Sequence, residues 1–394
     1  MRRFIPFILA LFVIAALLRI SFFFTILYLF LALALLSWLW MRRRVERLHV
    51  ERRFVNRAFY GDRVTVDLEV HNSGWLPIPW LELRESVPVD LLTPPLKGQV
   101  FSLGSRERRR LSYTLNCRRR GYYPIGPLTI KSGDLLGVVR SSTGQVAPSH
   151  LVVYPQVVPL HQLGLPTRSP LVALPAQAPL FEDPARVIGV RDYQRGDSPR
   201  RIHWTATASA GRLLVKQYQP AIARETLICL DLEEGDYHWR QRYTATELAI
   251  VVAASVANHI IVREGLAVGL ATEAQDPLLE EQVRFFLPPG SERTHLMSLL
   301  EVLARAQVAS GTSFLDLLRR ESLRLAWGAT LLVITGRESA SLFDMLVYLR
   351  RAGFAVALVL VQPDRPSAEL QKQADQLKLA VYRVWRAQDL EGWG

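Results

Sequence analysis

The sequence predicts three structural parts in order along the chain: a transmembrane helical hairpin, a small all-β sandwich-like domain and a doubly wound α/β domain. Two apolar runs open the chain, polar and apolar residues alternate from about residue 50 to 155, and apolar strands alternate with helices after residue 224. We place the membrane anchor at 1–45, the β domain at 46–157, a proline-rich linker with a charged motif at 158–224, and the α/β domain at 225–394. A chain of 394 residues is long enough for two soluble domains and an anchor.

The N-terminal anchor consists of two apolar runs, Phe4 to Leu18 and Ile20 to Met41, which are separated by Arg19. As one straight helix this stretch would be about 57 Å long, against a hydrocarbon core of about 30 Å. We therefore expect a tight hairpin with Arg19 at the far interface, or else one span with an interfacial first arm. Met1-Arg2-Arg3 before an apolar run also resembles a signal peptide, but the second run follows without a convincing cleavage site.

A cluster of arginines after the second apolar run indicates the orientation of the anchor. Its members are Arg42, Arg43, Arg44, Arg47, Arg52, Arg53 and Arg57. By the positive-inside rule, everything after residue 42 should lie on the cytoplasmic side of a bacterial inner membrane. Residues 1–60 hold ten Arg and two Glu, so only +4 of the formal net charge of +12 remains for the rest of the chain.

A second basic run extends from Arg106 to Arg120. It suits either anionic lipid headgroups or a solvated strand face. Because no zinc-finger spacing or RNA-recognition signature accompanies it, we expect no nucleic acid partner. Cys117 and Cys229 lie far apart in different predicted domains, which argues for a reducing compartment and against a disulfide or a cysteine-bound metal.

The β domain is predicted from short alternating runs. Between residues 64 and 70, valine and leucine alternate with polar residues, and Asn72-Ser73-Gly74 then turns the chain. Further runs lie at Trp80 to Arg84, Arg110 to Asn116, Leu128 to Lys131 and Leu151 to Tyr154. Such strands with Gly and Pro turns are typical of a sandwich or barrel. The prolines from Pro159 to Pro184 disfavour regular structure and predict an extended connection.

The α/β domain is predicted from a buried strand at Thr226 to Leu232 and a long helix at Tyr243 to Arg263. Further strands are expected at 266–271, 283–287, 329–335, 354–361 and 380–384, and further helices at 291–309, 314–325, 339–352 and 367–377. Ligands of such sheets bind at the carboxyl ends of the strands, where the strand order reverses. A site is therefore expected near Asp231 and near Thr335-Gly336-Arg337.

A charged motif between Gly189 and Tyr218 is too polar for an ordinary core element. Its candidate functional residues are Arg191, Asp192, Tyr193, Gly196, Asp197, Arg201, His203, Trp204 and Lys216. They form either a partner-binding face or an interdomain lattice in which ion pairs and the Trp204 indole clamp the β domain to the α/β domain, and we favour the clamp. His203 has no evident nucleophile beside it, so we favour a structural role for it.

This motif resembles the bacterial family called domain of unknown function 58. The resemblance extends to Arg120-Gly121-Tyr122-Tyr123, Gly133-Asp134-Leu135-Leu136-Gly137 and Tyr154-Pro155, and thus covers nearly the whole chain. It implies a membrane-anchored protein with a von Willebrand factor A-like domain, often encoded beside MoxR-type AAA+ ATPases. It implies no established activity.

The A-type fold implied by this resemblance often carries a Mg²⁺ site, whose first motif is Asp-x-Ser-x-Ser after the first strand. Here the loop reads Asp231-Leu232-Glu233-Glu234-Gly235, and the downstream position of a common Thr-Asp-Gly reads Thr335-Gly336-Arg337. A cation would bind at Asp231, Glu233, Glu234 and Thr335, but Arg337 would oppose it. We expect no cofactor and favour a solvated acidic loop paired with Arg337; Mg²⁺ binding stays open as the alternative.

Enzyme signatures are absent from the sequence: it has no phosphate loop, no Gly-x-Gly-x-x-Gly, no His-Glu-x-x-His and no Gly-x-Ser-x-Gly elbow. We therefore expect a membrane-tethered, non-enzymatic adaptor or scaffold. Its A-like domain would bind protein partners, with a MoxR-type AAA+ ATPase among them, in the assembly or maturation of other proteins. The alternatives are a metal-dependent enzyme or sensor that uses the acidic loop at Asp231, and a cell-envelope structural protein.

Overall fold

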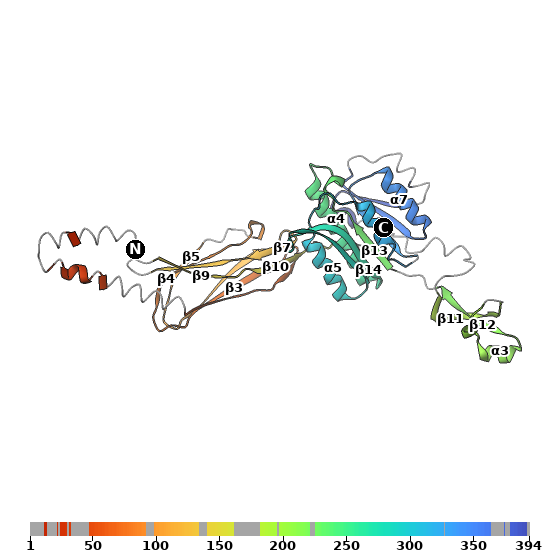
Figure 1. Cartoon of the computed structure of the whole chain (residues 1–394), viewed down its shortest axis with the longest axis horizontal. Helices are drawn as coiled ribbons and strands as arrows, with labels where there is room; N and C mark the ends of the chain where they lie inside the picture. The colour runs from red at the N-terminus through yellow and green to blue at the C-terminus, as the bar shows by residue number, and fades with distance from the viewer. Residues whose placement is uncertain are drawn as a thin grey trace. The chain divides into compact units, whose positions relative to one another are not determined.

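The computed structural model describes residues 12–13, 22, 24–29, 31–32, 47–91, 98–133, 140–160, 182–194, 197–220, 225–326, 328–363, 374 and 379–391. The chain divides into two compact units, Met1–Gln156 and Val157–Gly394 (Figure 1). Most of the two N-terminal apolar runs lies outside the described residues. The described parts of these runs are helical, and the hairpin anchor stays a prediction.

The first unit contains three small sheets. Its strands are β1 (Leu48–Arg53), β2 (Arg57–Phe59), β3 (Arg63–Asn72), β4 (Ile78–Glu85), β5 (Gln99–Leu103), β6 (Arg108–Asn116), β7 (Gly121–Ile125), β8 (Leu128–Gly133), β9 (Arg140–Val146) and β10 (Ser149–Tyr154), with a short 3₁₀ turn η1 (Val89–Leu91). The strand orders are β1-β3-β6, β2-β10-β7 and β5-β4-β8-β9. Neighbouring strands are antiparallel except β2 and β10, which are parallel.

Strand β3 explains how these sheets share their cores. Every second residue of β3 is buried, because alternate side chains of a strand point to opposite faces. Its first half packs with Leu115 and Leu151 in one apolar core. Its second half packs with Leu81 and Leu128 of the third sheet in another. The period of two that predicted this all-β part therefore reflects one buried and one solvated face.

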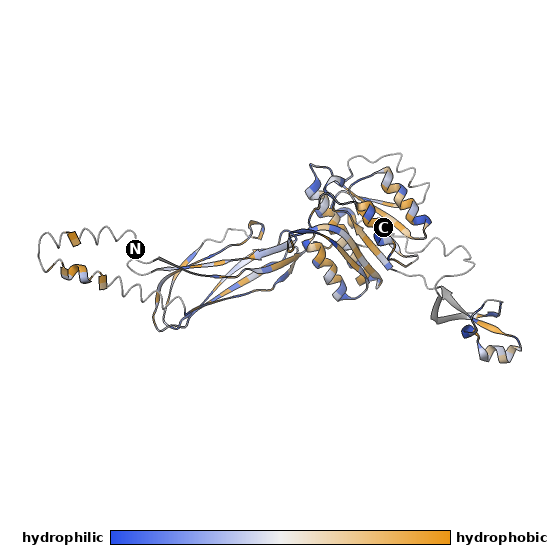
Figure 2. Ribbon diagram, in the orientation of Figure 1, coloured by the Kyte–Doolittle hydropathy of each residue, from blue (hydrophilic) through white to orange (hydrophobic). Residues whose placement is uncertain are grey.

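The second unit contains one open mixed sheet. Its strands are β13 (Glu225–Leu230), β14 (Ala267–Asp276), β15 (Glu281–Gly290), β16 (Thr330–Thr335), β17 (Ala355–Val361) and β18 (Ala380–Val384), in the order β15-β14-β13-β16-β17-β18. All neighbours are parallel except β14 and β15, which are antiparallel. The continuous apolar runs that predicted these strands arise because both faces of the sheet are covered. Figure 2 shows this concentration of hydrophobic residues along the sheet.

Helices cover both faces of this sheet. They are α4 (Arg242–His259), continued by the π-helical turn η5 (Ile260–Glu264), α5 (Arg293–Arg305), α6 (Phe314–Ser322) and α7 (Ala340–Arg351), with 3₁₀ turns η4 (Glu234–Asp236) and η6 (Ala387–Leu390). Helices α6 and α7 share a core with Leu227 and Cys229 of β13, while α4 contacts α5 and the central strands. Apart from the helix expected at 367–377, the strands and helices expected for this part are present among the described residues, and β14 and β15 run longer than expected. The helix expected at 367–377 lies outside the described residues except for Ala374.

One described helix, Arg242–Glu264, is apolar and long enough to cross a membrane. Its most apolar window is 78% buried inside the protein. It contacts β13, β16 and β17, so its apolar character is explained by its place against the sheet.

The charged motif folds as a β-hairpin with a short helix. Strands β11 (Glu182–Asp192) and β12 (Leu214–Pro220) pair antiparallel, and the connection contains η3 (Pro199–Arg201) and α3 (Trp204–Ala210). The expectation of an extended connection is therefore wrong at this end. Strand β11 runs through Pro184, and the ladder shifts register between Asp183 and Val187, which accommodates a residue without an N–H. Residues 161–181 lie outside the described residues.

Candidate functional site

A cavity of about 360 Å³ lies at the carboxyl ends of β13 and β16. Its lining includes Glu233, Gly235 and Asp236 from the β13–α4 connection, Thr312 and Ser313 before α6, and Thr335, Arg337, Ser339 and Ser341 from the end of β16 and the start of α7. Strands β13 and β16 are neighbours in the sheet but not in the sequence, so the strand order reverses between them. The cavity therefore occupies the position where ligands bind in open α/β sheets.

Asp231 follows β13 directly and is only 1% exposed. One carboxyl oxygen accepts a hydrogen bond from Thr335 Oγ1 at 2.6 Å, and the other accepts one from the backbone N–H of Glu233 at 3.0 Å. The Tyr237 hydroxyl donates to the Asp231 carbonyl at 2.7 Å. Burial, followed by repulsion from Asp236, raises the pKa of Asp231 well above its ordinary value. Asp231 thus favours its protonated form more than an exposed aspartate does.

The Glu233 carboxylate is held by a different loop. It accepts hydrogen bonds from the backbone N–H groups of Gly311 at 3.1 Å and Thr312 at 2.7 Å, and from Thr312 Oγ1 at 2.6 Å. Partial burial acts to raise the pKa of Glu233, but the donors from Thr312 and Gly311 outweigh it, so the pKa lies below its ordinary value. This carboxylate ties the β13–α4 connection to the segment before α6.

The remaining acids of this loop have separate basic partners. Asp236 Oδ1 accepts a hydrogen bond from Arg337 Nη1 at 3.0 Å, and Glu234 forms an ion pair with Arg242. The expectation that the acids of this loop, Asp231, Glu233 and Glu234, pair with Arg337 is therefore wrong, because Arg337 bonds Asp236 instead. Asp231 is buried because it follows a central strand directly, and Glu233 and Glu234 are bound by other groups.

Three residues that complete this arrangement were missed by sequence reasoning, namely Asp236, Tyr237 and Thr312, and Gly336 was named without a role. A Cβ at Gly336 would lie 2.4 Å from Tyr237 Cδ1 and 2.9 Å from the Asp236 carbonyl oxygen, so only glycine allows Tyr237 to pack there. The glycine in Thr335-Gly336-Arg337 was the one available signal of a close approach.

The side chains that line the cavity can donate and accept hydrogen bonds. The residues that line it include no His, Cys or Lys. Burial raises the pKa of the Cys117 thiol to about 11 and raises that of Cys229 as well, so neither thiol is activated. Within the described part of the chain, no group of three or more His, Cys, Asp or Glu is placed to hold a metal ion. The lining offers a guanidinium and several hydroxyls.

The charged motif has its own internal bonds. Arg191 donates two hydrogen bonds to Asp197, both at 2.7 Å, and the backbone N–H of Gln194 donates a third at 2.9 Å. The bonds from Arg191, then from Gln194, lower the pKa of Asp197 to about 2. His203 accepts from the backbone N–H of Ala206 at 3.2 Å and so caps α3, which is a structural task.

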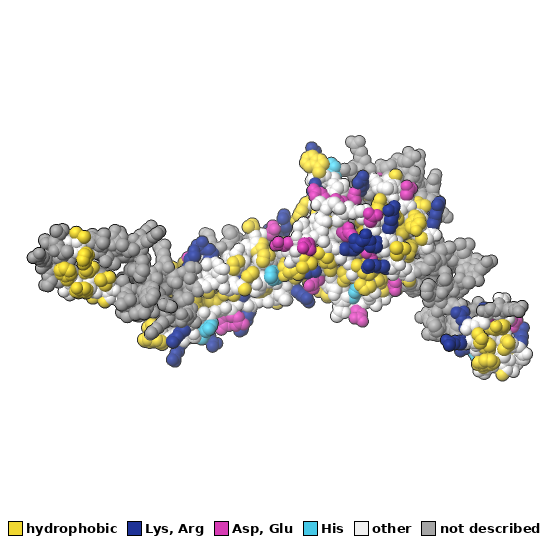
Figure 3. Space-filling view, viewed as in Figure 1, with side chains coloured by type: hydrophobic (Ala, Val, Ile, Leu, Met, Phe, Trp, Pro, Cys, Tyr) yellow, Lys and Arg dark blue, Asp and Glu magenta, His cyan; other side chains and the backbone are white. Residues whose placement is uncertain are grey.

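Other motif residues lie on the surface of the same hairpin. Asp192 pairs with Arg212 at 3.2 Å, and Lys216 lies opposite Val190 in the β11–β12 ladder. Tyr193 and Trp204 are exposed, and Gly196 lies outside the described residues. Arg201 ends η3 and is exposed. Figure 3 shows hydrophobic side chains with basic ones beside them on the visible face of this hairpin. The interdomain clamp stays a prediction.

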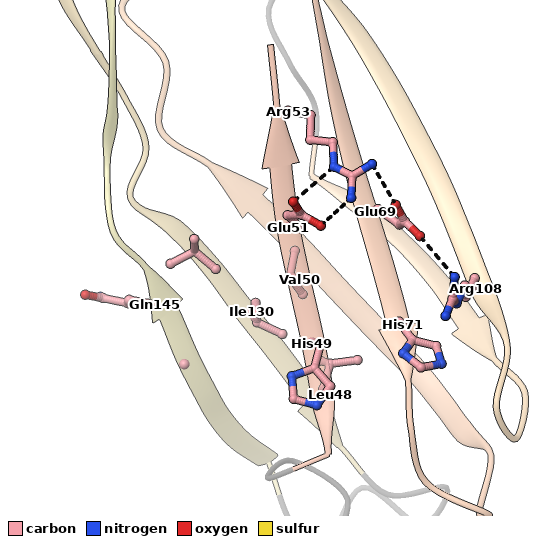
Figure 4. Close-up of a pocket in the computed structure, with 12 residues that line it drawn as sticks. Leu48, His49, Val50, Glu51, Arg53, Glu69, His71, Arg108, Ile130 and Gln145 are labelled. Carbon is pink, nitrogen blue, oxygen red and sulfur yellow. Dashed lines mark hydrogen bonds and ion pairs between the residues drawn. The ribbon is translucent and has the colours of Figure 1, made fainter.

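A larger cavity of about 570 Å³ lies in the first unit, between β1, β3 and β9 (Figure 4). Its charged side chains pair with one another: Arg53 bonds Glu51 at 2.7 Å and lies 3.8 Å from Glu69, which in turn lies 3.9 Å from Arg108. Exposed pairs of this kind contribute little free energy and point to no ligand. We therefore assign the candidate site to the smaller cavity, whose place in the sheet is the informative one.

Comparison with known proteins gives one family match. Residues 189–370 match the family described as "Protein of unknown function DUF58". The matched range contains the charged motif and all of the candidate site. A curated relative is the "Uncharacterized protein YeaD" of Bacillus subtilis (strain 168), which is 23% identical over 319 residues, covering 77% of this chain and 72% of the relative.

Solved structures show only distant likeness. An aerotolerance-related membrane protein from Bacteroides fragilis NCTC 9343 gives a TM-score of 0.30 at 15% identity, over 42% of this chain and 93% of that one. The CARDB domain of a Pyrococcus furiosus protein gives a TM-score of 0.22 at 21% identity, over 27% of this chain and 91% of that one. Neither likeness bears on function.

Proposed function

Since the chain is a DUF58 family protein, and that family is described as one of unknown function, we propose that it is a membrane-tethered, non-enzymatic adaptor or scaffold. Its second unit serves as a von Willebrand factor A-like domain that binds protein partners. The face that binds them includes the cavity at the carboxyl ends of β13 and β16.

The observation that carries this proposal is the composition of that cavity. It lies at the ligand position of the sheet, yet its lining has no His, Cys or Lys that could act as a nucleophile or as a base near neutral pH. What it exposes is Arg337, with 60% of its side chain accessible. Arginine is among the residues that dominate protein interfaces. A cavity with this lining is better suited to holding a partner than to a chemical step.

The A-like fold is supported by the sheet and by the two residues that end its central strands. The strand order places β13 at the centre, with an antiparallel strand at the β15 edge. Asp231 after β13 and Thr335 at the end of β16 occupy the positions that the family resemblance assigns to an adhesion site, and they bond each other at 2.6 Å. The degenerate motif keeps Asp231 and Thr335 at these positions, while Glu233 bonds Thr312 and Glu234 pairs with Arg242.

The membrane and the partner class come from the sequence. The two apolar runs before residue 42 and the arginines that follow support a bacterial inner-membrane anchor with both units in the cytoplasm. The family resemblance supports a MoxR-type AAA+ ATPase as a partner, with assembly or maturation of other proteins as the process. Within this scheme, the β11–β12 hairpin either orients the two units or adds a second contact surface.

Affinity capture tests the proposal. The full-length protein is purified from detergent extracts of cells that make it, and recovered proteins are quantified by mass spectrometry. We expect an AAA+ ATPase, and we expect Arg337→Gln to reduce its recovery at least about tenfold, as loss of a central interface arginine does. Arg319→Gln is the matched control, because Arg319 is 63% exposed and also pairs with one aspartate, Asp316. A folded and abundant wild-type bait that recovers no ATPase contradicts the adaptor.

A further inference from the structure

We propose that the cavity at the carboxyl ends of β13 and β16 binds the carboxylate of an acidic side chain directly, through Arg337 and without a metal ion. This inference rests on the proposed function, because it names the chemical group by which a protein partner docks. The acidic residues of this loop suggest a cation site, whereas we propose that the cavity binds an anion.

The first step is that both carboxylates that line the cavity, Glu233 and Asp236, already accept hydrogen bonds from the protein. Glu233 accepts three hydrogen bonds, two from Thr312 and one from Gly311. Asp236 accepts from Arg337 Nη1 at 3.0 Å. A divalent cation such as Mg²⁺ or Ca²⁺ needs several oxygens whose lone pairs are open to it. To bind one here, the loop would have to break the bonds that hold it in place.

The second step is that the site carries less negative charge than its sequence suggests. Asp231 is buried and favours its neutral form, so it adds no full charge. The charge of Glu233 faces two backbone N–H groups and a hydroxyl. The charge of Asp236 is offset by Arg337 itself. An incoming anion therefore meets no uncompensated carboxylate on the described walls of the cavity.

The third step is that hydrogen-bond donors remain available. A guanidinium has five N–H groups in a fixed fork, and the side chain of Arg337 uses Nη1 on Asp236. Ser339 Oγ accepts from the backbone N–H of Leu342 and shares one hydrogen bond with Ser341 Oγ at 3.2 Å. That shared bond uses one of the two hydroxyl hydrogens, which leaves the other free to donate. A carboxylate is the planar acceptor that an arginine fork matches.

The fourth step concerns the source of the carboxylate. A cavity of about 360 Å³ is near the small end of the range for ligand sites, so it suits one side chain. The same β13–α4 connection that supplies Asp236 also carries Trp239, which is 69% exposed, with the Arg240 guanidinium 4.8 Å from its ring centroid. Exposed Trp and Arg are the residues most often central to protein interfaces. They favour an Asp or Glu on a protein over a free small anion.

The test is protection of Arg337 from phenylglyoxal, an arginine reagent, in the full-length protein in detergent. Modification of each arginine is read at peptide level by mass spectrometry. The probes are acetyl-aspartyl-amide, its neutral isostere acetyl-asparaginyl-amide, inorganic phosphate and MgCl₂. With a Kd of about 10 mM, about 30 mM of the acidic probe should slow modification of Arg337 about fourfold. Arg319 is the internal control, because its exposure of 63% matches the 60% of Arg337, and its rate should not change.

The variant Asp236→Asn sharpens the test. It removes the carboxylate that competes for Arg337, so the acidic probe should protect at concentrations about two- to fivefold lower, as expected for loss of one exposed ion pair. Any of four results overturns the inference: equal protection by the neutral isostere, stronger protection by phosphate, protection by Mg²⁺ alone, or loss of protection in Asp236→Asn.

This experiment is independent of affinity capture. Protection without a recovered ATPase would leave the carboxylate site standing and contradict the adaptor. Recovery of the ATPase without protection of Arg337 would support the adaptor and contradict the carboxylate site.

Discussion

Two buried carboxyl groups, Glu85 in the first unit and Asp231 in the second, have different bonding partners. Glu85 in the first unit accepts hydrogen bonds from Arg52 Nε at 2.6 Å and from the Tyr113 hydroxyl at 2.5 Å, and the side chains of Arg52 and Glu85 are both almost fully buried. Asp231 in the second unit has no basic side chain bonded to it. Its carboxyl oxygens accept from Thr335 Oγ1 and from the Glu233 N–H, and the nearby arginine, Arg337, bonds Asp236 instead.

The difference shows what separates a structural charge cluster from a binding one. At Glu85 the arginine is enclosed, and it also bonds the Ala147 carbonyl and Ser149 Oγ, so its donors serve the fold. At Asp231 the acid is buried with a raised pKa, and Arg337 lies at the surface with 60% of its side chain exposed. The exposure of the cation, more than the burial of the acid, marks the site that can take a ligand.

The largest expected effect is on the first cluster. Glu85→Gln leaves the Arg52 charge buried without its partner and should lower the free energy of unfolding by about 3–5 kcal/mol. The other acceptors of Arg52, the Ala147 carbonyl and Ser149 Oγ, are neutral, and its Nη2 has no hydrogen-bond partner among the described residues. The control is Glu82→Gln on the same strand, whose partner Arg84 is exposed, with an expected loss below about 1 kcal/mol. Urea-dependent proteolysis of the full-length protein measures both, and equal losses would contradict the comparison.

The second effect concerns the packing of the site loop. Gly336→Ala places a methyl group against the Tyr237 ring and the Asp236 backbone, and overpacking of this kind lowers stability by about 1–3 kcal/mol. Gly235→Ala is the matched control, because its Cβ would meet only Glu233 Oε1, at 3.8 Å, and the change should stay within about 0.5 kcal/mol. The same proteolysis assay, read on peptides of the second unit, gives the values. Unchanged stability of Gly336→Ala would show that the Tyr237 ring does not pack against residue 336.

The third effect is a pH dependence that belongs to Asp231. Its folded pKa is raised, so its contribution to stability is fully present below the unfolded pKa of about 3.9 and is lost as the pH rises from there through the folded pKa. The slope is about 1.4 kcal/mol per pH unit for one proton.

Asp231→Asn should remove this slope, so that the variant gains stability relative to wild type as the pH rises. Unfolding measured at intervals from pH 4 upward checks this. A wild-type profile that Asp231→Asn leaves unchanged would mean that Asp231 is ionised in the fold.

The smallest effect is expected in the β11–β12 hairpin. Asp197→Ala removes the acceptor of Arg191 and of the Gln194 N–H, so the melting temperature and the amide protection of the hairpin should fall. Asp192→Ala, which loses only an exposed pair with Arg212, should change little. In wild type the contribution of Asp197 is present above its unfolded pKa and lost as the pH falls toward about 2. Unchanged stability with lost partner binding would assign this motif to a partner-binding face.

The strands and helices could be predicted wherever one periodicity dominates. Strand β3 follows from its alternating valines, and β13, β16 and β17 follow from apolar runs bounded by polar residues. Strand β11 could not, because Pro184 argues against a ladder and the pairing of β11 with β12 is formed across more than twenty residues of intervening chain.

The same distinction explains the site. Asp231 and Thr335 were predictable because each ends a strand, and strand ends meet at one edge of a parallel sheet. Thr312 and Tyr237 were not, because their contacts depend on how two loops fold against each other. The raised pKa of Asp231 follows from burial, and burial cannot be read from residue order.

The most direct test of the central claim is site-specific photo-crosslinking in living cells. A photoreactive amino acid is placed at Ser341, which lines the cavity, and in parallel at Ser298, an exposed position on α5. We expect the first position to give a discrete adduct with an AAA+ ATPase that disappears when Arg337→Gln is added, and the second to give none. Identical adducts from both positions, or an adduct at Ser341 that survives Arg337→Gln, would contradict docking at this site.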